Sequence, residues 1–147
     1  MAKLFIACDH AAYLEKVELI KFLTKLGHEV QDLGPHSADR VDYPDFAREV
    51  CKEVQHEKGL GILLCGSGIG MSIVANRYKN IRAALCRTEK EAELSKQHNN
   101  ANILCLGARI NTQAELESIT KAWLLSEFEK GRHSDRVAKF NDLGEVL

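Results

Sequence analysis

Residues 61–71 read Gly-Ile-Leu-Leu-Cys-Gly-Ser-Gly-Ile-Gly-Met. The continuously apolar run at 61–65 predicts a buried β-strand. The glycines that follow end this strand, and a helix is predicted from about Gly68 to Tyr78. An apolar strand that leads directly into a helix is typical of a parallel sheet covered by helices on both faces.

The same alternation of strand and helix continues on both sides of this segment. Further strands are predicted at 4–8, 28–33, 81–86 and 103–106. Helices are predicted at 14–26, from Asp42 to about Val54, from Thr88, and from Thr112 to about Lys130. A polar tail with Arg132, His133 and Arg136 closes the chain. The sequence therefore predicts a single α/β domain over 1–147, with a Rossmann-like, doubly wound, five-stranded parallel sheet and helices on both faces.

The composition argues against several classes of protein. The chain has 147 residues, of which 45% are hydrophobic and 28% charged, and its formal net charge is −1. A balanced charge provides no general attraction to nucleic acid or to an anionic membrane. No apolar run approaches the roughly 20 residues of a membrane span, and the N-terminal apolar run is too short for a signal peptide. We expect a cytoplasmic protein with neither a nucleic-acid partner nor a membrane partner.

The cysteines and histidines show no framework for disulfides or metal binding. The five cysteines lie at 8, 51, 65, 86 and 105 without a Cys-x-x-Cys spacing, which indicates free thiols in a reducing compartment. The six histidines have neither a His-x-x-x-His spacing nor a ligand spacing shared with cysteine. We therefore expect no metal site.

Doubly wound sheets bind ligands outside the carboxyl ends of their strands, so candidate site residues follow 8, 33, 65, 86 and 106. Asp9 and His10 come directly after the first strand. Asp9 alone could simply cap the next helix, but an Asp-His pair at the ligand edge favours a functional role. After the third strand, the glycines of 65–70 leave backbone N–H groups open to an anion, such as an oxyanion or an enediolate.

This glycine loop is not a nucleotide-binding motif. It lacks the Lys-Ser/Thr of a Walker loop, and position 71 is Met where Gly-x-Gly-x-x-Gly needs its last glycine. Cysteines at strand ends are usually buried and inert, which is the expectation for Cys8, Cys86 and Cys105. Cys65 directly precedes the anion-binding loop, and this position favours a reactive thiolate.

Two further groups have more than one interpretation within a single chain. His98 lies among asparagines before the fifth strand, where it could interact with a helix end while the asparagines form turns. A second subunit could instead present it to another chain's site. Arg109, Arg132 and Arg136 are either solvated surface residues or a clamp for a phosphate.

Six motifs occur in order along the chain: Cys-Asp-His at 8–10, Asp-Tyr-Pro at 42–44, Cys-Gly-Ser-Gly-Ile-Gly at 65–70, Gln-His-Asn at 97–99, Gly-Ala-Arg at 107–109 and Gly-Arg-His…Arg at 131–136. In these motifs the sequence resembles the ribose-5-phosphate isomerase B family, which also includes galactose-6-phosphate isomerase subunits. Each motif alone is modestly specific, but six in the same order are strongly so. The resemblance implies a homodimer with shared active sites, in which the C-terminal helix and tail contact the partner subunit. The sequence does not distinguish a dimer from a tetramer.

The resemblance also implies a role for each candidate residue. Cys65 is implied as the base that moves a proton between C1 and C2, Ser67 as the group that assists transfer between the substrate oxygens, and His98 as the acid that opens the furanose ring. The implied enediolate and sugar contacts are Gly66, Gly68, Ile69, Gly70, Asp9, His10, Tyr43 and Asn99, and the implied phosphate ligands are Arg109, Arg132 and Arg136. No cofactor and no metal is implied. Ser67 stands where many members carry Thr, and the hydroxyl is kept.

Three functions are compatible with these residues. The preferred one is the interconversion of D-ribose 5-phosphate and D-ribulose 5-phosphate through a cis-enediolate. The second is the isomerisation of a hexose 6-phosphate, such as allose or galactose 6-phosphate, which needs a longer pocket. The third is a non-catalytic module that binds a phosphate ligand and has no need of Cys65 or His98.

Overall fold

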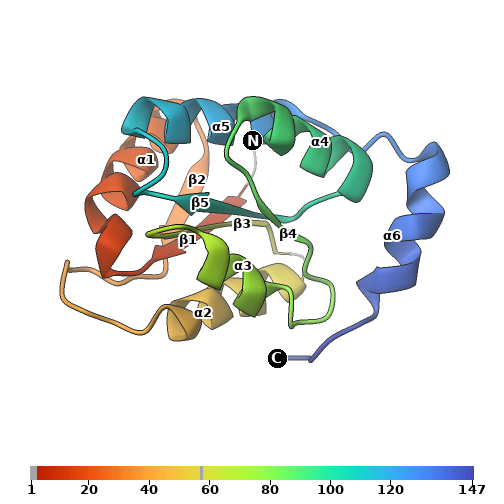
Figure 1. Ribbon diagram of the computed structural model, residues 1–147, viewed down its shortest axis with the longest axis horizontal. Helices are drawn as coiled ribbons and strands as arrows, with labels where there is room; N and C mark the ends of the chain where they lie inside the picture. Colours follow the sequence, from red (N-terminus) through yellow and green to blue (C-terminus); the bar gives the residue numbers. More distant parts are fainter. Residues whose placement is uncertain (1–2, 57) are drawn as a thin grey trace.

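The computed structural model describes residues 3–56 and 58–147, and its centre is one parallel sheet (Figure 1). The five strands are β1 (Lys3–Cys8), β2 (Glu29–Asp32), β3 (Leu60–Cys65), β4 (Ala83–Leu85) and β5 (Ile103–Gly107). They lie in the order β2-β1-β3-β5-β4. The predicted five-stranded parallel sheet is confirmed, although β2 and β4 are shorter than the ranges predicted for them.

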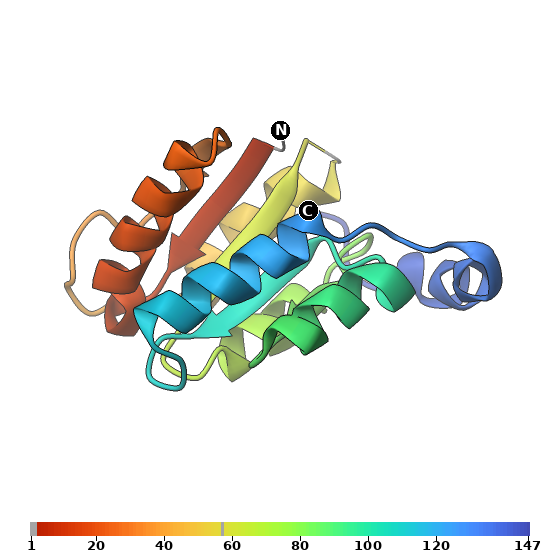
Figure 2. The same ribbon diagram turned by 90° about the horizontal axis from the view of Figure 1, so that it is seen from above.

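Helices cover both faces of the sheet, as predicted (Figures 1 and 2). One face carries α1 (Tyr13–Lys25), α4 (Glu89–Asn99) and α5 (Gln113–Leu125), and the other carries α2 (Tyr43–Gln55) and α3 (Ile69–Ala75). Two short 3₁₀ helices, η1 (His10–Ala12) and η2 (Gly131–His133), precede α1 and α6 (Ser134–Asn141). In both views α6 projects beyond the β4 edge of the sheet.

The core consists of one apolar layer on each face of the sheet. Alternate residues of a strand point to opposite faces, so the buried strands supply side chains to both layers. Ile62 and Leu64 pack with Trp123 of α5 on one face, whereas Leu63 packs with Val50 of α2 on the other. This two-sided burial is the reason that the strands read as continuous apolar runs rather than as alternating ones.

The strand register places the ends of the central strands level with each other. Cys8 is the partner of Leu64, and Cys65 is the partner of Gly107. The chain goes from β1 to β2 on one side and then returns to β3 on the other side of β1. The strand order therefore reverses between β1 and β3, which is where a doubly wound sheet opens a crevice for a ligand.

The helix starts follow the predicted caps with two differences. Asp42 is the N-cap residue of α2, but its side chain makes no capping hydrogen bond. The Thr112 hydroxyl accepts from the Glu115 N–H, and the Glu115 carboxylate accepts from the Thr112 N–H, so the capping box of α5 is complete. At α4 the Thr88 hydroxyl accepts from the Glu91 N–H, but the Glu91 carboxylate accepts from the N–H of Arg87 instead. The second box is therefore only half formed.

The predicted end of the fifth helix was wrong, because α5 stops at Leu125 rather than near Lys130. The Ser126 hydroxyl donates to the carbonyl of Ala122 (2.9 Å), while the Ser126 backbone is extended. A serine that bonds back to the preceding turn competes with the helix and can end it. The segment beyond it pairs with α4 through the Glu129 N–H and the Gln97 carbonyl (3.0 Å). The predicted polar tail is largely helical, since η2 and α6 lie within it.

Candidate active site

A pocket of about 640 Å³ lies at the carboxyl ends of β1, β3 and β5. Its lining is drawn from four segments of the chain that are far apart in sequence: Asp9, Tyr43, Cys65, Gly66, Ser67, Ile69, Gly70, Ile73, Arg109 and Ile110. The strand-end rule had pointed to this edge, and eight of the predicted site residues meet here: Asp9, Tyr43, Cys65, Gly66, Ser67, Ile69, Gly70 and Arg109. Gly68 lies buried within the same loop.

Cys65 sits at the base of this pocket with 5% of its surface exposed. The N–H of Gly68 donates to the Cys65 sulfur at 3.1 Å, because Gly68 adopts a left-handed conformation with φ +77° and turns the loop back over the strand end. A hydrogen bond donated to sulfur favours the thiolate, which is the reactive form of cysteine. The geometry therefore supports a chemically active Cys65.

The loop also offers hydrogen-bond donors to a bound anion. Within the described residues, the N–H groups of Gly66, Ser67 and Gly70 have no hydrogen-bond partner. The Ser67 hydroxyl oxygen accepts from the Ile69 N–H (3.2 Å), which leaves the hydroxyl proton available to a ligand. Unpaired N–H groups next to a thiol are the arrangement needed to stabilise negative charge that develops on a substrate oxygen.

The other four cysteines lack this setting. Burial raises the pKa of the Cys8 and Cys51 thiols to about 12 and that of Cys86 to about 11. Burial also raises the pKa of Cys105 well above its ordinary value. These four thiols stay protonated at neutral pH, in agreement with the inert role expected for Cys8, Cys86 and Cys105.

The Asp9 side chain caps a helix and also faces the pocket. Its carboxylate accepts from the Ala11 N–H (3.0 Å) and so caps η1, and the same side chain lines the pocket. His10 lies beside it, and its Nδ1 accepts from the Val41 N–H (3.3 Å). In the neutral ring the proton is then on Nε2, so His10 can donate a hydrogen bond from that atom.

Tyr43 and Arg109 form opposite walls of the pocket. A Cβ built on Gly70 would lie 2.7 Å from Cζ of Tyr43, so this ring packs directly on the glycine loop. A Cβ built on Gly66 would lie 3.4 Å from both Cδ and Nη1 of Arg109, which places the guanidinium against the other end of the loop. Within the described part of the chain, no carboxylate forms an ion pair with Arg109.

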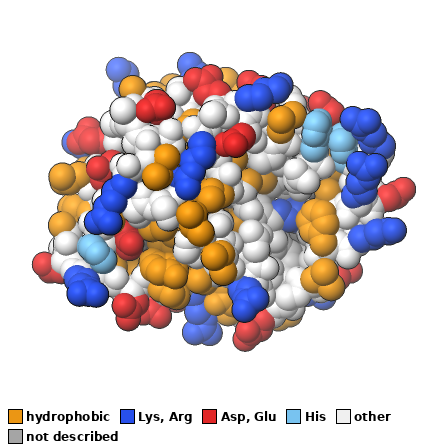
Figure 3. All heavy atoms as spheres, viewed as in Figure 1, with side chains coloured by type: hydrophobic (Ala, Val, Ile, Leu, Met, Phe, Trp, Pro, Cys, Tyr) orange, Lys and Arg blue, Asp and Glu red, His pale blue; other side chains and the backbone are white. Residues whose placement is uncertain are grey.

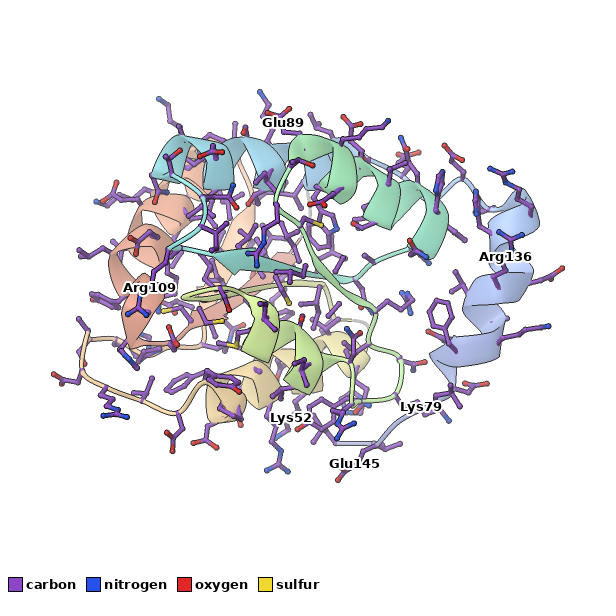
Figure 4. The ribbon with its side chains drawn as sticks, viewed as in Figure 1. Lys52, Lys79, Glu89, Arg109, Arg136 and Glu145 are labelled. Carbon is purple, nitrogen blue, oxygen red and sulfur yellow. The ribbon has the colours of Figure 1, made fainter. Side chains whose placement is uncertain are left out.

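The remaining predicted site residues lie away from this pocket. His98 and Asn99 are at the end of α4, next to the amino end of β5, and Arg132 and Arg136 belong to η2 and α6. Figure 4 shows Arg136 on α6 and Arg109 at the opposite side of the molecule. One chain therefore holds two separate groups of predicted residues: the thiol with its loop, and a cluster of imidazoles and arginines.

The His98 ring stacks on the His133 ring, with centroids 4.4 Å apart and planes inclined by 16°. Glu129 Oε2 lies 3.8 Å from Nε2 of His98 and 3.7 Å from Nε2 of His133. Burial of the His133 ring, together with the positive charge of His98 and Arg132, lowers the pKa of His133 below 6.5. His133 is therefore mainly neutral at neutral pH, which limits the repulsion between the two stacked rings.

His98, Glu129 and His133 also form a candidate set of metal ligands that the sequence spacing did not reveal, with ligand atoms within 4.8 Å of one another. The donor types suit zinc. However, the lone pairs of the two stacked rings lie in nearly parallel planes and so do not converge on one centre. The arrangement fits a metal ion poorly unless the rings rotate.

The family model for Ribose/Galactose Isomerase matches residues 4–140. The chain belongs to the ribose/galactose isomerase family. It is 41% identical over 138 residues to ribose-5-phosphate isomerase B of Escherichia coli, with 93% of each chain covered. It is also similar to the structure of a ribose 5-phosphate isomerase from Thermotoga maritima, with a TM-score of 0.93, 44% identity and coverage of 95% and 97%. The structure of ribose-5-phosphate isomerase B from Mycoplasma genitalium with bound ribulose-5-phosphate gives a TM-score of 0.92, 42% identity and coverage of 95% and 93%.

Three residues at this ribose/galactose isomerase pocket or directly behind its loop were missed from the sequence: Ile73, Ile110 and Arg87. Ile73 and Ile110 line it and are 59% and 56% exposed, and Ile69 beside them is 48% exposed. Figure 3 shows hydrophobic side chains gathered in the middle of the face that carries α3. Arg87, directly after β4, contacts the glycine loop from behind through the Ser67 carbonyl. The strand-end rule had pointed to the residues after 86, but nothing in the sequence showed the backbone contact.

Two other depressions lie elsewhere on this family member. A groove of about 850 Å³ runs between α4 and α5, and its lining includes Glu89, Glu93, Glu127 and Lys121 but no thiol and no glycine loop. A second, of about 400 Å³, lies between the sheet and α6, is lined by Arg82, Asn99 and Phe140, and forms part of the hollow visible in Figure 3. Neither combines a nucleophile with an anion-binding loop. None of the helices in the described chain is long and apolar enough to cross a membrane.

Proposed function

We propose that this sugar-phosphate isomerase interconverts D-ribose 5-phosphate and D-ribulose 5-phosphate, with Cys65 as the base. The observation that carries the proposal is the Cys65 sulfur, which accepts the Gly68 N–H at 3.1 Å at the base of a loop with unpaired N–H groups. A base and an anion cradle together are what the reaction needs, because the proton on C2 of an aldose is weakly acidic until the enediolate is stabilised. The ribulose-5-phosphate in the Mycoplasma genitalium relative supports the pentose.

The proposed reaction transfers one proton at each step, and Cys65 returns the proton that it removes. The Cys65 thiolate removes the proton from C2 of the open-chain aldose, and the electron pair moves to the carbonyl to give the enediolate. The loop N–H groups of Gly66 to Gly70 hold the negative oxygen, while the Ser67 hydroxyl passes a proton between O1 and O2. The Cys65 thiol then returns its proton to C1, which leaves the ketose and regenerates the thiolate. No metal or redox cofactor takes part in this scheme.

The sugar and the phosphate need groups on both sides of the pocket. We place Asp9, His10 and Tyr43 at the sugar and Arg109 near the phosphate. The other proposed groups, His98 as the ring-opening acid, Asn99 at the sugar, and Arg132 and Arg136 at the phosphate, come from the second subunit of a homodimer. Both arginines are exposed and, within the described residues, neither forms an ion pair.

One observation and one rule of symmetry support a dimer that shares its sites. The apolar rim formed by Ile69, Ile73 and Ile110 surrounds the Cys65 pocket, so a partner that covers this rim would also close the pocket. In a two-fold dimer each subunit contributes the same surface, so one subunit's α4 end and α6 can serve the other's pocket. The 1–147 chain then acts as one catalytic domain that exchanges its C-terminal contacts with the partner, in the cytoplasm.

A complementation experiment tests the shared site. Cys65→Ala and His98→Asn are each expected to lose activity by about 10²–10⁴-fold, the usual contribution of a proton-transfer group. When the two proteins are mixed and allowed to exchange subunits, half of the dimers are mixed and each has one intact site, which restores about a quarter of the parent activity. No recovery, despite proven subunit exchange, would show that each site is built from one chain.

Steady-state assays decide the substrate and the mechanism. We expect a higher kcat/KM for ribose 5-phosphate than for allose 6-phosphate, and the reverse preference would move the chain to the hexose phosphates. Cys65→Ala turning over as fast as the parent would exclude the thiolate mechanism. We expect activity to persist in excess chelator, and its loss would implicate a metal. A protein that binds sugar phosphates without converting them would be a binding module.

A further inference from the structure

Arg87 is held in a fixed direction behind the glycine loop. Its backbone N–H donates to Glu91 Oε2 (2.6 Å), and its carbonyl accepts from Nδ2 of Asn111 (3.0 Å). Both contacts are made by side chains of the elements that flank the carboxyl ends of β4 and β5. With its N–H and its carbonyl both bonded, residue 87 presents its side chain along a defined path to the loop.

The Arg87 guanidinium reaches the carbonyl oxygen of Ser67, to which Nη1 donates a hydrogen bond. Gly107 makes room for this contact, since a Cβ built there would lie 2.6 Å from Arg87 Nη1 and 2.6 Å from Ser67 O. Among residues 3–56 and 58–147, no carboxylate forms an ion pair with the Arg87 guanidinium. Its charge is therefore directed at the Ser67 carbonyl rather than neutralised by an acid.

The peptide unit that Arg87 contacts is the one that serves Cys65. The carbonyl of Ser67 and the N–H of Gly68 belong to the same peptide, which is trans, so the two groups point in opposite directions. On one side the carbonyl accepts from Arg87, and on the other side the N–H donates to the Cys65 sulfur at 3.1 Å. A cation on the carbonyl both fixes the plane of the peptide and polarises it, which strengthens the N–H as a donor.

We propose that Arg87 is a positioning residue for the isomerisation, acting on Cys65 through the Ser67–Gly68 peptide. This rests on the proposed role of Cys65 as the base. Arg87 neither gives nor takes a proton in the reaction. It holds the Gly68 N–H on the sulfur, so that a hydrogen bond able to stabilise negative charge on Cys65 is in place when the open-chain sugar binds. Glycine at 68 makes such an anchor necessary, because its backbone can rotate more freely than that of any other residue.

The test compares Arg87→Met and Arg87→Gln, which remove the cation, with Arg87→Lys, which retains it. Arg77→Met is the matched control, because Arg77 is exposed and its side chain makes no contact with the loop. Native proteins are treated briefly with iodoacetamide across a pH series, and modification of Cys65 is quantified on its peptide by mass spectrometry. The pH profile of kcat/KM for ribose 5-phosphate is measured on the same samples.

We expect the alkylation curve of Cys65 and the acid limb of kcat/KM to move up together by about one pH unit in Arg87→Met and Arg87→Gln, an approximately tenfold loss of rate at low pH. KM should change less than twofold, and Arg87→Lys should recover part of the shift. Unshifted curves in both neutral variants, an equal shift in Arg77→Met, or an effect confined to KM would each overturn the proposal. Because alkylation requires no turnover, it still tests Arg87 if an active Cys65→Ala protein has refuted the role of Cys65.

Discussion

Replacing Gly68 with Ala tests whether the loop conformation is what makes Cys65 reactive. Gly68 has φ +77°, and a Cβ built there would lie 2.9 Å from both the carbonyl carbon and the oxygen of Leu106 and 2.7 Å from Cδ1 of Leu85. The left-handed backbone costs an alanine about 1–2 kcal/mol. The overlap with the backbone of β5 adds about 1–3 kcal/mol, because a strand in the centre of a sheet cannot move aside.

Gly131→Ala is the matched control for stability. Gly131 also has a positive φ of +54°, but a Cβ built there meets no atom within 4 Å. The control should therefore lose only the backbone contribution of about 1–2 kcal/mol, whereas Gly68→Ala should lose about 2–5 kcal/mol. Urea unfolding at one fixed protein concentration measures both, since the stability of an oligomer depends on concentration.

The activity of Gly68→Ala gives an independent readout. The clash moves the Gly68 N–H away from the Cys65 sulfur. A misplacement of about 1 Å near reacting groups typically lowers kcat/KM by about 10²-fold. The reasoning is refuted if Gly68→Ala unfolds at the same urea concentration as Gly131→Ala. It is equally refuted if Gly68→Ala keeps the parent kcat/KM.

Three further predictions concern the pocket wall and two lysines. Gly70→Ala displaces the ring of Tyr43, which is half-exposed and can move into solvent. We therefore expect a free energy of unfolding within about 1 kcal/mol of the parent but a KM raised about tenfold. An unchanged KM would contradict a sugar contact at Tyr43. The fully buried Lys16 amine pairs with Asp32 (2.7 Å). Asp32→Asn leaves this cation buried without its partner, so it should lower the free energy of unfolding in urea by about 3–5 kcal/mol. Lys16→Met leaves no buried cation and should lower it by less; the opposite order would contradict this interpretation. Burial lowers the pKa of Lys96 from 10.5 to about 8. Below pH 8 Lys96 is protonated in both the folded and the unfolded protein, and the folded protein carries the full cost of burying its charge. This cost decreases as the pH rises from 8 toward 10.5, because Lys96 then loses its proton in the folded protein. The gain in Tm of Lys96→Met should therefore be largest at pH 7 and smaller at pH 10. A lower Tm for Lys96→Met at pH 7 would refute it.

The sequence predicted those features that depend on burial and on strand ends. The strands were found because residues buried on both faces, such as Leu63 and Leu64, form uninterrupted apolar runs. The pocket edge followed from the topology of parallel sheets, which brings Asp9 and Cys65 together although 55 residues separate them in sequence. Neither inference required a side-chain contact to be known in advance.

Features decided by single hydrogen bonds were not predictable. Phe128 continues the apolar spacing of α5, yet the helix stops at Leu125, where the Ser126 backbone becomes extended and the Ser126 hydroxyl bonds back to Ala122. The role of Arg87 could not be predicted from its residue type, because its partner is the backbone carbonyl of Ser67 rather than an acidic side chain. A pattern of residue types carries no information about which peptide plane a guanidinium will contact.

The separation of the chemical groups follows from the direction of the helices relative to the strands. α4 starts after β4 at the carboxyl edge and ends at His98 and Asn99, just before β5 begins. Cys65 pairs in register with Gly107, the last residue of β5, so the length of β5 lies between the thiol and the imidazole. Four steps along this strand amount to about 13 Å, which no change of side-chain rotamer can close. Within one chain the proposed base and the proposed acid therefore lie at opposite edges of the sheet, and for this reason the proposed active site takes His98 from a second subunit.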